Sequence, residues 1–191
     1  RPFVASFDKP GGNIVNTRLA IGDGCEVTMQ RAGQIGDDTV VSITGGGRLL
    51  LNSHAETLGS LLLTNVHADA DPTLLDATGT TLTLRRDITT SVFNEDGNIP
   101  TIKGRLALAP GPHIFDLNNA LLGPGIDLQG PIGGAGGFSK FGNATLVLAT
   151  SNSFSGPVAV HDGILDIQDA YALGTTSSGL TVTDGTLILR R

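Results

Sequence analysis

The stretch that decides the fold runs from Gly136 to Leu165 and reads GGFSKFGNATLVLATSNSFSGPVAVHDGIL. It holds short apolar alternations at 145–148 and 157–160, and a third at 164–167 begins inside it. Turn-forming residues separate these alternations, and the connections are too short to hold a helix. Because side chains alternate between the two faces of a strand, each piece is expected to bury one face. Several short strands at near-even spacing predict an all-β architecture.

The same stretch resembles the autotransporter-associated β-strand repeat of bacterial surface and secreted proteins. That repeat has the pattern Gly-apolar-x-Lys-x-Gly, Thr-Leu-x-Leu, Asn-x-aromatic-x-Gly and Val-x-x-Gly-x-Leu. The matching positions are Gly137, Phe138, Lys140, Gly142, Thr145, Leu146, Leu148, Asn152, Phe154, Gly156, Val160, Gly163 and Leu165. The departures are Ala144 in place of Gly, Pro157 after Gly156, and Ile164 in place of Thr. The resemblance implies a right-handed parallel β-helix (β-solenoid) in an exported protein, extracellular or at the cell surface. It implies no catalytic, cofactor-binding or metal-binding residues, because the repeat carries none.

The chain also resembles itself. Leu19-Ala-Ile21-Gly-Asp-Gly24 aligns with Val158-Ala-Val160-His-Asp-Gly163, so that the two turn glycines correspond. Further apolar alternations match along the two copies: 27–29 with 165–167, 41–43 with 180–182, and 49–51 with 187–189. Repeat units of this kind bury their apolar faces only by stacking on their neighbours. We therefore predict an inward ladder made of Leu19, Ile21, Leu49, Leu51, Leu146, Leu148, Val158, Val160, Leu187 and Leu189.

Residues 1–191 are predicted to form a single β-helix domain. Residues 1–17 are interpreted as an initial segment or cap, with a strand at 3–7 that Pro10-Gly11-Gly12 would end. Residues 118–137 are expected to be an irregular loop region, because Gly and Pro interrupt the pattern there repeatedly. We take this region as a seam between two runs of coils. The chain opens at Arg1 without Met, so we interpret it as a processed product or an excised fragment.

Composition excludes several classes of partner. The net charge of −6, the absence of Trp and the single Tyr argue against nucleic acid and against anionic membranes. Cys25 is the only cysteine, so an internal disulfide or a thiolate metal cage cannot form. No apolar run approaches the roughly 20 residues of a spanning helix, which argues against membrane insertion.

The polar residues at turns are interpreted as structural. Aspartates beside glycine, namely Asp23, Asp37, Asp162 and Asp184, are expected to bond nearby backbone and not calcium. The four histidines, His54, His67, His113 and His161, are scattered, and a surface or turn role is expected for each. Lys140 could bind an acidic sugar, but the repeat itself carries a lysine at this position. Asn143-Ala-Thr145 is a formal glycosylation sequon that the likeness does not require.

An enzymatic β-helix would need carboxylates clustered in one groove. Asp69, Asp71 and Asp76 form the one tight group, and we interpret it as a solvated loop. We therefore predict no enzymatic activity, no cofactor and no metal. The predicted function is a structural stalk or scaffold within an exported protein, with the rest of a longer chain as its partner. Two alternatives stay open: a subunit that stacks end to end with itself into filaments, and an adhesin that binds a surface glycan.

Overall fold

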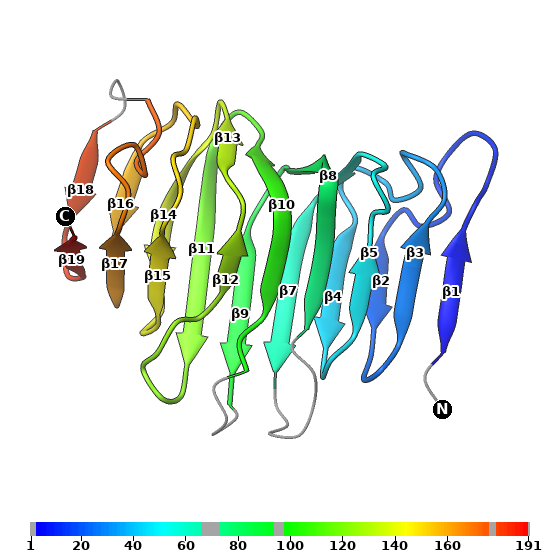
Figure 1. The fold of residues 1–191 in the computed structure, drawn as a ribbon, viewed down its shortest axis with the longest axis horizontal. Helices are drawn as coiled ribbons and strands as arrows, with labels where there is room; N and C mark the ends of the chain where they lie inside the picture. The colour runs from blue at the N-terminus through cyan, green and yellow to red at the C-terminus, as the bar shows by residue number, and fades with distance from the viewer. Residues whose placement is uncertain (1–2, 66–72, 94–97, 176–178, 191) are drawn as a thin grey trace.

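The computed structural model describes residues 3–65, 73–93, 98–175 and 179–190. Every regular element in these ranges is a β-strand, and the paired strands are parallel throughout. The strands follow one another along the long axis of the molecule, from β1 at one end to β18 and β19 at the other (Figure 1). The chain is thus an all-β solenoid of about seven turns, as its sequence predicts.

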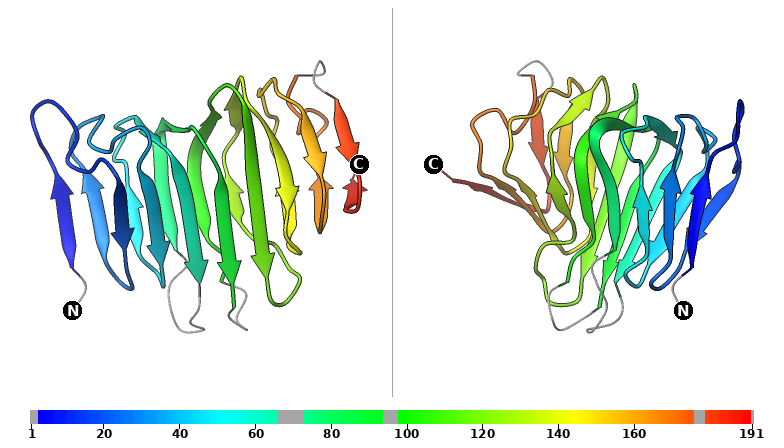
Figure 2. Two further views of the ribbon diagram at one scale, coloured as in Figure 1. Left: turned by 180° about the vertical axis from the view of Figure 1, so that it is seen from behind. Right: turned by 45° about the vertical axis from the view of Figure 1, so that its right-hand side comes forward.

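Within the described ranges, three sheets form the walls of the solenoid. Sheet 1 contains β1 (Val4–Phe7), β3 (Glu26–Met29), β5 (Arg48–Leu50), β6 (Glu56–Leu58), β8 (Leu74–Leu84), β10 (Thr101–Leu108), β12 (Asp127–Gln129) and β13 (Ile132–Gly134). Sheet 2 contains β2 (Arg18–Ile21), β4 (Val40–Thr44), β7 (Ser60–Asn65), β9 (Ile88–Val92), β11 (Pro112–Asn119), β14 (Gly137–Phe141), β16 (Val158–Val160) and β18 (Leu180–Val182). Sheet 3 contains β15 (Thr145–Leu148), β17 (Ile164–Ile167) and β19 (Thr186–Leu189). The view from behind shows the strands of sheet 2 in succession from β2 to β18 (Figure 2).

Coil length varies along the stack. In sheet 2, Val40 pairs with Ser60 on the next coil, whereas Leu61 pairs with Ile88, so the second of these coils is several residues longer. A parallel ladder needs only that strands of adjacent coils match in register, so the loops at the corners absorb the difference. The strands therefore stay in register while the loops between them differ in length from coil to coil.

One apolar column fills the interior. The strands alternate between buried and outward residues, as in β7, where Leu61 and Leu63 are buried and Leu62 and Thr64 face outward. Within the column, the ring of Phe138 stacks on Phe115 at a centroid distance of 4.6 Å and meets Phe154 edge-on at 5.7 Å. Burying one Leu or Val contributes roughly 1.5 to 3 kcal/mol, so the column is the main source of stability.

The two copies recognised in the sequence occupy equivalent places. Leu19 pairs with Val41 in one copy, and Val158 pairs with Leu180 in the other; likewise Val27 pairs with Leu49, and Leu165 with Leu187. Eight of the ten predicted ladder residues are buried. The other two depart from the prediction: Leu187 is only partly buried and Leu189 is 68% exposed. Among the described residues no further strand pairs with β19 beyond β17, so no described strand covers these two side chains.

Strands form both in 1–17, where one was predicted at 3–7, and in 118–137, which was expected to be an irregular loop region. Residues 1–17 include β1, which pairs with β3. Residues 118–137 include β12 and β13, which both pair with β10 and continue sheet 1. Glycine is needed there for close approach between coils, since a Cβ at Gly130 would lie 2.0 Å from the carbonyl oxygen of Gly104. The glycines that suggested a loop thus serve coil stacking.

Candidate functional site

One of the four turn aspartates, Asp162, contacts backbone, as its sequence context predicts. The Oδ1 atom of Asp162 accepts a hydrogen bond of 2.7 Å from the N–H of Gly163. Asp76 belongs to β8 and not to a loop, and its Oδ1 atom accepts 2.9 Å from the N–H of Thr78. The other two members of that acidic group, Asp69 and Asp71, lie outside the described residues, as does His67. The described ranges contain no group of three or more His, Cys, Asp or Glu side chains placed to hold a metal ion.

His113 differs from the surface or turn role expected for it. Its side chain is 1% exposed, because β11 turns it toward the interior. The ring bridges two carbonyl oxygens, with Nδ1 2.5 Å from the oxygen of Arg86 and Nε2 2.9 Å from that of Ala109. Since Arg86 belongs to the preceding coil, the ring ties two coils together at a corner.

Lys140 is also turned inward, by the alternation of β14, and is fully buried. Its Nζ atom donates to three backbone carbonyls: Phe141 at 3.2 Å, Gly142 at 2.8 Å and Asp162 at 3.0 Å. Burial lowers the pKa of this amine to about 8, against the opposing attraction of Asp162 and Asp116. An amine enclosed in this way is not available to an acidic sugar. Lys140 therefore ties one corner to the next.

Asn143, the sequon residue, bonds the neighbouring coil. Its Oδ1 atom accepts from the N–H of Asn119 at 3.0 Å, and its Nδ2 atom donates to the carbonyl of Asn119 at 3.1 Å. A glycan on Nδ2 would compete with the second bond. Cys25 is part-buried and packs against the core.

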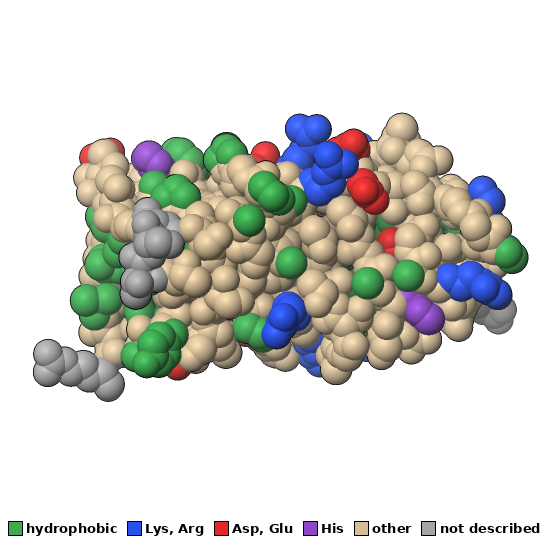
Figure 3. All heavy atoms as spheres, turned by 90° about the horizontal axis from the view of Figure 1, so that it is seen from above, with side chains coloured by type: hydrophobic (Ala, Val, Ile, Leu, Met, Phe, Trp, Pro, Cys, Tyr) green, Lys and Arg blue, Asp and Glu red, His purple; other side chains and the backbone are tan. Residues whose placement is uncertain are grey.

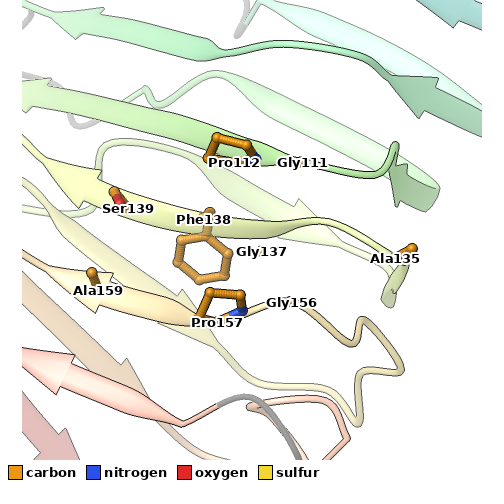
Figure 4. A pocket seen from close by; sticks show the side chains of 9 residues that line it. All are labelled: Gly111, Pro112, Ala135, Gly137, Phe138, Ser139, Gly156, Pro157 and Ala159. Atoms are coloured by element: carbon orange, nitrogen blue, oxygen red, sulfur yellow. The ribbon is translucent and has the colours of Figure 1, made fainter.

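A hollow lies on the outer face of sheet 2, over β11, β14 and β16. It has a volume of about 340 Å³. Pro112 and Pro157 flank it on the two coils either side of the one that carries Gly137, and the ring of Phe138 lies at its base (Figure 4). A Cβ at Gly137 would lie 2.1 Å from the carbonyl oxygen of Pro157, so glycine is required there and the space stays open. The lining is mainly apolar.

An aromatic pair lies on the same outer face, further along the strands. The ring of Phe141 stacks on the imidazole of His161 at 4.5 Å with an interplanar angle of 6°. Phe141 is 37% exposed and pairs in register with Asp116 on β11. A flat ring pair beside an apolar hollow can hold the apolar face of a sugar or another ring.

The sequence analysis missed this hollow. The signal that could have found it is the recurrence of Gly111-Pro112, Gly136-Gly137 and Gly156-Pro157 at the coil spacing. That signal has meaning only once the register is known, because the three dipeptides are unequally spaced along the chain.

Charged groups on the upper face are mixed in sign. Acidic and basic side chains lie next to one another near its middle (Figure 3). Asp38 pairs with Arg85 at 3.4 Å and with Arg86 at 3.7 Å, and all three side chains are well exposed. Exposed pairs of this kind contribute little, typically below about 1 kcal/mol.

Comparison with known proteins gives one partial likeness. A stretch of 68 residues, 34% of this chain, is 39% identical to the adhesin BmaC autotransporter of Brucella suis biovar 1 (strain 1330). The stretch corresponds to 2% of that protein's length. No family model matches the chain, and no solved structure matches it significantly. The described residues include no helix that is long and apolar enough to cross a membrane.

Proposed function

We propose that this chain is a non-enzymatic, structural β-solenoid segment of a surface-exposed, autotransporter-type protein, in which it acts as a stalk or scaffold. The observation that carries the proposal is the continuous stack. One apolar cluster runs from Leu19 to Ala172, and buried polar side chains such as Lys140 and His113 tie adjacent coils. The likeness to an autotransporter adhesin supports a surface location.

A stalk should form a rigid rod and should not cleave polysaccharides. Electron microscopy of the purified chain at two concentrations should show dispersed short rods at both. Regular filaments at the higher concentration would favour the end-to-end subunit instead. The same preparation should release no reducing ends from a panel of acidic and neutral polysaccharides. Steady release that is lost on heat unfolding would overturn the non-enzymatic assignment.

The hollow on sheet 2 favours a second candidate function, lateral binding of a surface glycan. Ala159 lines the hollow and faces outward from β16. Its equivalent in the first copy is Ala20, an exposed outward position on β2 away from the hollow. If the hollow binds sugar, Ala159→Trp should abolish signals on a glycan array, whereas Ala20→Trp should retain them. If the wild-type chain gives no signal on the array, glycan binding is contradicted and the stalk role remains.

A further inference from the structure

The corner between β16 and β17 places a carboxyl group against the main chain. Asp162 is exposed, and its Oδ1 atom accepts a hydrogen bond of 2.7 Å from the N–H of Gly163. The carboxyl carbon that carries Oδ1 therefore lies beside the nitrogen of the next residue. When such a nitrogen loses its proton and the carboxyl group is protonated, the nitrogen can attack the carbon and close a five-membered succinimide ring. Holding the two groups together favours this intramolecular reaction.

Packing requires glycine at position 163. A Cβ there would lie 2.6 Å from the Nζ atom of Lys140 and 2.5 Å from the carbonyl oxygen of Gly142, and the residue has a φ of +63°. A glycine has no side chain to hinder its own nitrogen, so it is the most reactive residue that can follow an aspartate. The packing that encloses Lys140 thus places the most reactive neighbour after Asp162.

Lys140 acts on the same amide group. Its Nζ atom donates to the carbonyl oxygen of Asp162 at 3.0 Å, and this carbonyl belongs to the peptide bond that contains the nitrogen of Gly163. A charged donor at the oxygen withdraws electron density from the nitrogen and stabilises the anion that forms when the N–H loses its proton. Lys140 is fully buried, which strengthens this effect. Its pKa of about 8 keeps it an ammonium at mildly acidic pH.

We propose that Asp162 is a site of spontaneous isomerisation to isoaspartate, assisted by Lys140. In the first step the nitrogen of Gly163 bonds to the side-chain carboxyl carbon of Asp162. The carboxyl O–H leaves and takes the amide proton with it as water. In the second step a water molecule adds to the main-chain carbonyl carbon of Asp162, which Lys140 polarises, and the bond from this carbon to the nitrogen of Gly163 breaks. One water is lost and one is gained, so the mass is unchanged and no co-reactant is needed.

The product gives the buried ammonium a charged partner. After the second step the main chain runs through the former side chain of Asp162, and the former main-chain carbonyl is a carboxylate. This carboxylate forms from the group that lies 3.0 Å from the Nζ atom of Lys140. A buried charge is stabilised by a hydrogen-bonded opposite charge, so hydrolysis toward isoaspartate is favoured over return to aspartate.

The first sequence copy contains the equivalent pair without the lysine. Asp23-Gly24 corresponds to Asp162-Gly163, and both glycines have a φ of +63°. In the described ranges β2 is the outermost strand of sheet 2, so no described strand stands beside it where β14 stands beside β16.

The next coil contains a third pair, with valine in place of the lysine. Asp184-Gly185 follows β18 as Asp162-Gly163 follows β16. Val160 pairs with Val182 of β18, just as Lys140 pairs with Val160. A Cβ at Gly185 would lie 2.4 Å from the Cγ1 atom of Val160, so an apolar group occupies the place of the ammonium.

The test compares these three Asp-Gly pairs within one folded chain. The wild-type chain is kept at mildly acidic pH for several weeks and digested, and isoaspartate at each pair is quantified by liquid chromatography with electron-transfer fragmentation. Isoaspartate should form at Asp162 about 10-fold or more faster than at Asp23 or Asp184. In a sample unfolded in urea the three pairs should react at similar rates, because only local sequence then acts.

Two variants test the lysine. Lys140→Met should lower the rate at Asp162 to that of the other two pairs, whereas Lys103→Met, which removes an outward-facing lysine of β10, should leave it unchanged. Circular dichroism checks that both variants are folded. The direction of the change separates a donor from a structural tie, because a corner that is only loosened would react faster. The comparison among the three wild-type pairs does not depend on either variant.

Two results would overturn the proposal. The first is isoaspartate that forms at Asp162 no faster than at Asp23 and Asp184 in the folded wild-type chain. The second is a rate at Asp162 that stays the same or rises in folded Lys140→Met.

Discussion

Two buried ionisable side chains connect neighbouring coils in opposite ways. Glu56 is 2% exposed, and its carboxylate accepts from the N–H groups of Gln34 at 2.8 Å and Ile35 at 3.2 Å, both on the preceding coil. Lys140 is fully buried and donates to carbonyl oxygens, the farthest of which along the chain belongs to Asp162 on the following coil. The charge at each corner matches the backbone groups it meets. Amides face a carboxylate, and carbonyls face an ammonium.

The difference shows how a solenoid tolerates coils of unequal length. In the strands, backbone N–H and C=O groups pair with those of the adjacent coil through the parallel ladder. At the corners the ladder is interrupted, and a buried backbone group without a hydrogen-bond partner costs about 1 to 3 kcal/mol. A long polar side chain can reach the next coil and supply the missing partner. Burial opposes the charge in both cases, since it raises the pKa of Glu56 and lowers that of Lys140 to about 8. Each charge is therefore stable only because of its partners.

A carboxylate placed in the column without partners should have the largest effect. Leu148 faces inward on β15 and is 2% exposed, whereas Thr145 faces outward on the same strand. Leu148→Asp should lower the free energy of unfolding by about 4 kcal/mol or more, because it removes a core side chain and adds an unpaired charge. Thr145→Asp should cost less than about 1 kcal/mol, as is usual for a surface substitution. Equal losses in urea unfolding would contradict the inward assignment of the ladder.

Removing the carboxylate of Glu56 comes next. Glu56→Ala leaves the N–H groups of Gln34 and Ile35 without their acceptor and should cost about 2 to 4 kcal/mol. Glu56→Gln keeps one acceptor oxygen and should cost about half as much. Thr57→Ala is the matched control, since Thr57 faces outward on the same strand. Urea unfolding monitored by circular dichroism measures all three, and similar losses in Glu56→Ala and Thr57→Ala would contradict a stabilising role for the Glu56 carboxylate.

The sequence predicted the strands of the apolar column, but it did not predict the side-chain contacts at the corners. The alternation at 27–29 and 165–167 predicted buried strands, and the internal alignment predicted that Val27 and Leu165 are equivalent, as their pairs with Leu49 and Leu187 in the structure agree. The roles of His113, Lys140 and Glu56 did not follow. Each depends on which backbone group lies one coil away, and the length of a coil changes along the stack. Periodicity along a strand is local, whereas contacts at a corner require the lengths of the loops between strands.

Lys140 should give stability a dependence on alkaline pH. Because its folded pKa is about 8 and its ordinary value is 10.5, the unfolded chain holds the proton more strongly between these values. The free energy of unfolding should therefore rise between pH 8 and pH 10.5, by up to about 3 kcal/mol. Lys140→Met lacks this group, so the wild-type minus variant difference isolates it. A difference that stays flat, or that falls across this range, would show that the carbonyls hold the ammonium charged.

Glu56 should give a smaller effect of the same kind at acid pH. Burial raises its pKa above 4.5, and Asp37 adds to this, although the bonds from Gln34 and Ile35 oppose it. Between pH 4.5 and the folded pKa, the folded chain holds the proton more strongly than the unfolded chain. The contribution of Glu56 to the free energy of unfolding should therefore fall as pH rises through this interval and level off above it.

The Glu56 contribution is measured as the wild-type minus Glu56→Gln difference in urea unfolding from about pH 4 to about pH 7. Asp76 and Asp166 have lowered pKa values and give slopes of opposite sign, but both proteins contain them, so they cancel in the difference. A difference that rises with pH would mean that the two backbone N–H groups outweigh burial. The Glu56 corner would then favour its charged form, in contrast to the Lys140 corner, and the two would no longer be equivalent solutions.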